Sequence, residues 1–74
     1  MLTRKQALDQ AIGRSGLTQK EICKRAMISE PTLTKKLKEP GLFKLSEITR
    51  LDKVLHFTDD EIIAIARGGY DKWF

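Results

Sequence analysis

Apolar residues recur along the chain at intervals of three and four, the spacing that places them on one side of a helix. We find no sustained alternation of apolar and polar residues, the pattern typical of strands. The spacing predicts five helices, over residues 3 to about 13, 18 to 26, 29 to 38, about 45 to 55, and 58 to 67. One apolar side of the fourth helix is expected to contain Leu45, Ile48, Leu51, Val54 and Leu55.

Side chains that can satisfy the free amide groups of a helix start stand at most of these boundaries. The strongest signal lies at the second helix, where Thr18 and Glu21 form a capping box and Leu17 and Ile22 stand in staple positions. The other predicted caps are Thr3, Ser29 and Thr58. Predicted breaks stand at Gly13 and Gly16, at Pro40 and Gly41, and at Gly68 and Gly69.

Length and composition limit the fold to one compact all-α domain over residues 1–74. The chain has 74 residues, 41% of them hydrophobic, which suffices for one modest core. Cys23 and His56 are the only residues of their kinds, so neither a disulfide nor a metal site is expected to staple the fold. We expect Cys23 to be a small buried hydrophobe and His56 to end a helix, because histidine tolerates positive φ.

The sequence lacks the motifs of the commoner kinds of enzyme. It has no Gly-rich phosphate loop, no metal-ligand spacing and no nucleophile elbow, so we expect no catalysis, no cofactor and no small-molecule ligand. The longest apolar run, residues 62–66, is five residues long, which is too short for a membrane span or a signal peptide. We therefore expect a soluble cytoplasmic protein.

Charge is distributed unevenly along the chain. The net charge is +4, of which residues 1–44 contribute +6, from ten basic and four acidic groups, and residues 45–74 contribute −2, from four and six. A basic first half favours a polyanionic partner such as nucleic acid, although a solvated surface would have the same composition.

The most informative segment is residues 17–38, in which residues 27–29 alone separate two predicted helices. This is the spacing of a helix-turn-helix motif, whose second helix enters the major groove of DNA. Helical periodicity places Leu33 and Leu37 on the inner face of that second helix. The outer face is polar and basic and contains Pro31, Thr34, Lys35 and Lys38.

Over about residues 4–66, the sequence resembles the helix-turn-helix domains of phage repressors and Cro, the Xre-like or lambda-repressor-like family. The resemblance rests on Leu17, Thr18, Gln19, Ile22, Cys23, Ala26, Ile28, Ser29, Thr32, Leu33, Thr34, Leu51, Val54, Leu55, Phe57, Thr58 and Glu61. The chain departs from the family pattern at Met27, where the turn glycine usually stands, and at Lys36, which is usually apolar. The first outward residues of the motif's second helix, Glu30 and Pro31, also differ from the pattern.

The resemblance implies separate residues for positioning and for reading DNA. It assigns phosphate contacts to Thr18 and Gln19 and, on the flanks of the groove, to Thr32, Lys36, Lys38 and Lys44. It assigns base contacts to Glu30, Pro31, Thr34 and Lys35. Lys35 would donate to guanine O6 or N7, Glu30 would accept from cytosine N4, and Pro31 or the Thr34 methyl group would contact a thymine methyl.

Two further features leave alternatives open. Met27 either adopts a strained left-handed conformation or buries its flexible side chain in a shifted turn. Residues 69–74 contain three of the five aromatic residues in the chain. These aromatic side chains would either complete the core of the domain or form a two-fold interface.

From the sequence we therefore expect a sequence-specific regulator of transcription that binds double-stranded DNA. The resemblance favours a repressor of phage or prophage type that acts as a homodimer on a palindromic site. One alternative is an antitoxin of similar fold that regulates its own operon. Another is a protein-interaction module on the same scaffold, which an acidic residue, Glu30, on the reading helix would suit.

Overall fold

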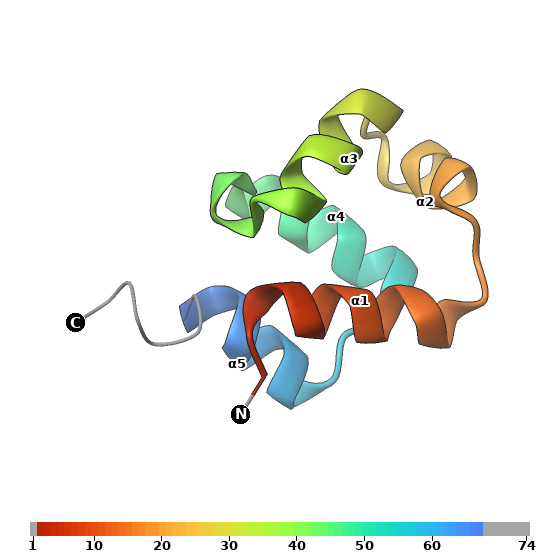
Figure 1. The fold of residues 1–74 in the computed structure, drawn as a ribbon. Coiled ribbons are helices and arrows are strands. Elements are labelled where there is room, and N and C mark those ends of the chain that lie inside the picture. The colour runs from red at the N-terminus through yellow and green to blue at the C-terminus, as the bar shows by residue number, and fades with distance from the viewer. Residues whose placement is uncertain (1, 68–74) are drawn as a thin grey trace.

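Five helices form where the capping residues predict them. The computed structural model describes residues 2–67, and within this range the chain has five α-helices, one short 3-10 turn and no strand (Figure 1). The elements are α1 (Arg4–Ser15), α2 (Gln19–Ala26), α3 (Glu30–Lys38), η1 (Pro40–Leu42), α4 (Leu45–Leu55) and α5 (Asp59–Arg67). The predicted compact all-α fold with five helices is confirmed.

Capping side chains begin four of the five helices. The Thr18 hydroxyl accepts from the backbone N–H of Glu21 at 3.2 Å, and the Glu21 carboxylate accepts from the Thr18 N–H at 3.1 Å. Thr3 forms the same reciprocal pair with Gln6 at the start of α1. The other two caps are Ser29 for α3 and Thr58 for α5. The predicted caps are therefore confirmed.

The end of α1 differs from the prediction. Gly13 lies inside the helix, which continues to Ser15 and ends at Gly16 in the left-handed conformation, with φ 70°. Gly13 only lowers helix propensity, whereas the left-handed conformation at Gly16 stops the hydrogen-bond pattern. The predicted break at Gly16 is confirmed, whereas the one at Gly13 is wrong, and α1 continues two residues past Gly13.

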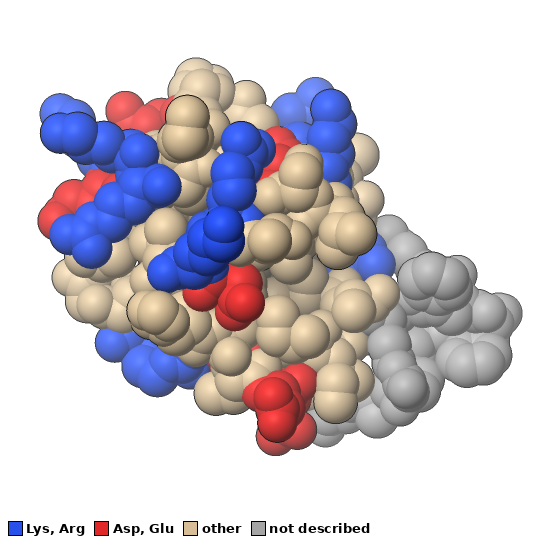
Figure 2. Space-filling model, turned by 180° about the vertical axis from the view of Figure 1, so that it is seen from behind, with Lys and Arg blue, Asp and Glu red and all other residues tan. Residues whose placement is uncertain are grey.

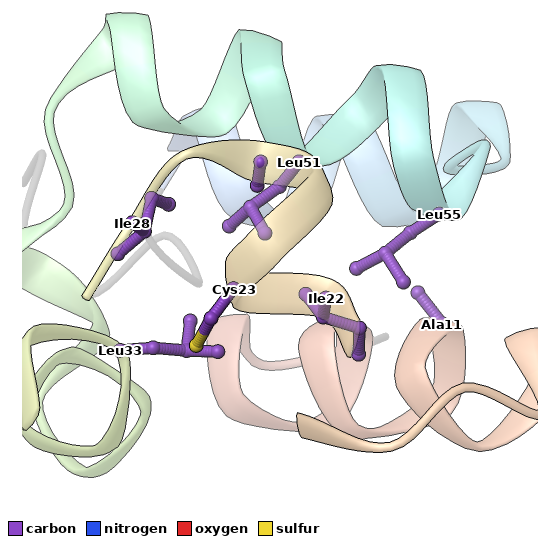
Figure 3. Close-up of a cluster of buried hydrophobic side chains, with 8 residues drawn as sticks. Ala11, Ile22, Cys23, Ile28, Leu33, Leu51 and Leu55 are labelled. Atoms are coloured by element: carbon purple, nitrogen blue, oxygen red, sulfur yellow. The ribbon is translucent and has the colours of Figure 1, made fainter. Parts of the chain in front are cut away.

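The main core lies between α1, α2, α3 and α4. It consists of Ala11, Ile22, Cys23, Ala26, Ile28, Leu33, Leu51 and Leu55 (Figure 3). The thiol of Cys23 is buried among these side chains, as predicted, and desolvation raises its pKa. A second cluster of Ala7, Leu8, Ala64 and Ile65 joins α1 to α5.

One residue of the predicted apolar side of α4 lies outside this core. Leu51 and Leu55 are buried and Ile48 and Val54 are half-buried, but Leu45 is 81% exposed. Leu45 is the first residue of α4, and its side chain stands beyond the packed part of the helix. Helical periodicity predicted which residues of α4 share one face, but not how much of that face is covered by the core.

This packing places α2 and α3 at one end of the molecule and α5 at the other, with α1 and α4 between them (Figure 1). Within residues 2–67, no helix is both long and apolar enough to cross a membrane. The aromatic segment 69–74 lies outside the described residues.

Candidate nucleic-acid interface

The turn between α2 and α3 passes through a left-handed residue. Met27 has φ 58° and ψ 44° and ends α2, and the Ile28 N–H donates to the carbonyl of Cys23 at 3.0 Å. Ile28 is buried, which fixes the turn to the core, whereas the Met27 side chain is 79% exposed. The left-handed interpretation of Met27 is therefore confirmed, and the alternative of a buried thioether is wrong.

Helix α3 touches the core on only one side. Leu33 is its one buried residue, and Leu37 is half-buried one turn later. The opposite side faces solvent and forms a shallow hollow of about 640 Å³. Its lining residues are Glu30, Pro31, Thr34, Lys35, Lys38 and Glu39. The structure therefore brings all four predicted base-contacting residues together on one exposed surface, which we call the α3 face.

The start of α2 is exposed and offers backbone donors. The Thr18 hydroxyl takes part in the cap, accepting from Glu21 N–H and donating to the Glu21 carboxylate at 3.0 Å. Gln19 is the first residue of the helix and its side chain is exposed. A helix start holds amide groups and a partial positive charge that suit an anion.

Of the predicted flanking residues, Lys38 and Lys44 are exposed. Thr32 is half-buried, and its hydroxyl oxygen accepts from the Ser29 hydroxyl at 2.7 Å. That hydrogen bond belongs to the cap of α3, so the Thr32 hydroxyl already has a structural partner.

Lys36 lies apart from the other predicted site residues. Its ammonium group donates to both oxygens of the Glu47 carboxylate, at 2.6 and 2.8 Å, and its side chain is only 15% exposed. The expected place on the outer flank is therefore wrong, because position 36 faces α4 and the buried carboxylate there holds the charge.

Glu47 itself was not singled out by the sequence. Its carboxylate also accepts from the backbone N–H of Lys44 at 2.8 Å, at the start of α4. The hydrogen bond from Lys36 lowers the pKa of Glu47. A signal for this residue existed, because Glu47 stands three positions after the N-cap residue of its helix, Lys44, as Glu21 stands three after Thr18.

A second buried carboxylate, Glu61, joins α5 to α1. It is completely buried and accepts from the two terminal nitrogens of Arg14 at 2.7 and 2.8 Å and from Gln10 at 3.0 Å. It also accepts from the Thr58 N–H at 2.9 Å, which completes the capping box of α5. Hydrogen bonding from Arg14 lowers the pKa of Glu61 to about 2.

Positive charge is concentrated near α2 and α3. On the face shown in Figure 2, most of the Lys and Arg side chains lie in the upper half, at the end formed by these two helices. The exposed basic residues of the two helices are Lys20, Lys24, Arg25, Lys35 and Lys38. The first turn of α5, at the other end of the molecule, is acidic.

Among residues 2–67, no three His, Cys, Asp or Glu side chains are grouped as a metal site would require. Models of protein families, curated proteins and solved structures were compared with the chain, and none of them matches it. A proposal for function therefore depends on the geometry and charge of the α3 face.

Proposed function

We propose that this protein is a sequence-specific regulator of transcription that binds double-stranded DNA with α3 in the major groove. The observation that supports this most strongly is the left-handed turn at Met27. It joins two short helices through one buried residue, Ile28, and leaves the outer side of α3 free of protein contacts within the described chain. A single helix exposed along one side fits the major groove, which is about 12 Å wide.

The chemistry of the α3 face suits base edges. Lys35 offers a donor for guanine O6 or N7, and the Glu30 carboxylate offers an acceptor for the cytosine amino group. Pro31 and the methyl group of Thr34 offer apolar contact for a thymine methyl group. All four side chains are exposed and line the same hollow.

We assign phosphate contacts to the start of α2 and to two exposed lysines. The start of α2 supplies amide groups and the exposed Gln19 side chain, and Lys38 and Lys44 supply positive charge. Thr18 has no free donor for a phosphate, because its backbone N–H and its hydroxyl both donate to the Glu21 carboxylate. We assign no phosphate contact to Lys36, because Glu47 holds its ammonium group.

We further propose that the protein is a repressor of phage or prophage type, without a cofactor, that acts as a homodimer on a palindromic site. The resemblance of residues 4–66 to the Cro and repressor domains supports this part. Two copies would place their α3 helices about one turn of DNA apart, and occupancy of a promoter would block transcription.

A protein-interaction module is the second candidate function. The exposed carboxylate of Glu30, at the first position of α3, is the observation that favours it. A carboxylate is repelled by DNA phosphates, and only a hydrogen bond from a cytosine amino group would offset that repulsion.

A gel-shift titration against random duplex DNA at several salt concentrations tests the proposal. We expect binding at low salt and a log–log slope of about −0.9 for each phosphate contacted. Selection of bound duplexes from a random pool should then yield one enriched sequence. Absence of binding at low salt would contradict the proposal and favour the interaction module. Salt-dependent binding without an enriched sequence would contradict sequence-specific recognition.

A further inference from the structure

One polar side-chain contact joins helix α3 to another helix of the described chain. Its only side-chain hydrogen bonds to another element within residues 2–67 are those from Lys36 to Glu47. The hydroxyl of Thr32 bonds only to Ser29, in the cap of the same helix. The ion pair therefore joins the proposed reading helix directly to the start of α4.

The pair also removes one positive charge from the surface. Three lysines stand in the last turns of α3, and Lys35 and Lys38 are exposed, whereas the Lys36 side chain is 15% exposed and that of Glu47 is 9% exposed. A buried pair with short hydrogen bonds competes well with outside anions, because separating it would leave the Glu47 carboxylate buried without a partner.

Without a carboxylate partner, a lysine at position 36 would extend its ammonium group toward solvent. Beside a DNA backbone it would add a phosphate contact, which strengthens binding to every sequence alike.

We propose that Glu47 limits the sequence-independent affinity of the protein for DNA by holding the ammonium group of Lys36 inside the domain. This inference rests on the proposed function. It makes Glu47 a positioning residue, which acts through Lys36 and does not itself touch DNA.

The substitution Glu47→Gln tests the inference with little change of shape. A glutamine at this position can still accept the Lys44 N–H, as Gln6 accepts the Thr3 N–H at the start of α1. Lys36 would lose its charged partner and extend outward. We expect the salt slope on random duplex to steepen by about 0.9 and the affinity at 0.1 M salt to rise roughly five- to tenfold.

The double variant Lys36→Met/Glu47→Gln is the matched control, because it removes both charges and returns position 36 to an apolar residue. Its expected salt slope equals that of the unmodified protein. An unchanged slope in Glu47→Gln, or an equal steepening in the double variant, would overturn the inference.

Thermal melting followed by circular dichroism shows whether each variant folds. If Glu47→Gln alone does not fold, the double variant decides. A slope shallower by about 0.9 would mean that Lys36 contacts phosphate in the unmodified protein, which overturns the inference, and an unchanged slope supports it. If the unmodified protein shows no salt-dependent binding, the proposed function fails and the inference fails with it. If the unmodified protein binds DNA but Glu47→Gln does not steepen the salt slope, the inference is overturned and the proposed function stands.

Discussion

Two residues with side chains adopt the left-handed conformation in the described chain. Met27 ends α2 with φ 58°, and His56 ends α4 with φ 53° while its N–H donates to the Asp52 carbonyl at 2.8 Å. The predicted role of His56 as a helix terminator is confirmed. A residue with a Cβ atom in this conformation costs about 1–2 kcal/mol, so both positions store backbone strain where glycine would have none.

Replacement of Met27 by glycine is therefore expected to stabilise the protein. The side chain is 79% exposed, so its removal gives up little buried surface, and glycine relieves the strain. We expect a net gain of about 1 kcal/mol, or a rise in melting temperature of about 4–8 °C, measured by thermal unfolding. The DNA sequence preference should stay the same.

The variant Met27→Ala is the control, because it removes the same side chain but keeps the Cβ atom. Its melting temperature should stay within about 2 °C of the unmodified protein. If glycine lowers the melting temperature, the packing of the exposed side chain outweighs the backbone strain.

At the scale of helices, the sequence predicted most of what local chemistry determines. The caps at Thr3, Thr18 and Ser29 act within one turn, so the residues that form them stand three apart and can be recognised in the sequence. The end of α1 and the turn η1 were harder to predict from the sequence. A glycine inside a helix and a glycine that ends one differ only in backbone conformation, which the packing of the following residues decides.

The buried carboxylates could not be predicted from local chemistry alone. Glu47 and Glu61 are the third residues of their helices, the position that completes a capping box. This position is often exposed, as it is for Glu21. Their burial depends on Lys36 and Arg14, which are 11 and 47 residues away in the chain. The same long-range contact moved Lys36 from the predicted outer flank to the interior.

The different roles proposed for α2 and α3 in DNA binding give a prediction at this scale. Lys35 lies on the α3 face and Gln19 at the start of α2, so the first should read a base and the second should hold a phosphate. We expect Lys35→Ala to cost about 1–3 kcal/mol on the best site and to relax the preference at one base pair. Gln19→Ala should weaken binding to all sequences by a similar factor.

Competition titrations on the selected site and on scrambled duplex measure both effects. Lys5→Ala is a suitable control, because Lys5 is an exposed lysine of α1 that lies 3.6 Å from Asp9, at the end of α1 away from α2. Its affinity for both duplexes should stay close to that of the unmodified protein. A uniform loss for both Lys35→Ala and Gln19→Ala would contradict the assignment of Lys35 to a base edge.

Charge is distributed unevenly over residues 2–67. The basic residues of α2 and α3 lie at one end, and Asp59 and Asp60 at the other (Figures 1 and 2). This asymmetry would orient the protein toward a polyanion before contact, with the α3 face leading.

Residues 70–74 allow a test of assembly. If their aromatic side chains complete the core, removal of residues 70–74 should lower the melting temperature of a protein whose oligomeric state is unchanged. If they form a two-fold interface, the truncated chain should be a folded monomer with weaker DNA binding. Sedimentation and thermal melting distinguish the two roles, and a truncated protein that is equally stable, equally assembled and equally active would contradict both.

The contact between the first and last helices of the described chain makes the stability of the whole fold depend on pH. Arg14 of α1 lowers the pKa of Glu61 of α5 from its ordinary value of 4.5 to about 2. A pKa that is lower in the folded than in the unfolded state means that the ionised carboxylate stabilises the fold. This stabilisation is fully present above about pH 5 and is lost as the pH falls from there toward 2.

Substitution of Glu61 should therefore change both the stability and its dependence on pH. Near pH 7, Glu61→Gln leaves Arg14 without its buried partner, and we expect the melting temperature to fall by about 10 °C. Between pH 5 and 2 the difference from the unmodified protein should shrink, because acid removes the same charge from Glu61. Asp60→Asn removes an exposed charge from the same turn and should change neither quantity much. A constant difference between Glu61→Gln and the unmodified protein across this range would mean that Glu61 contributes shape rather than charge to the contact between α1 and α5.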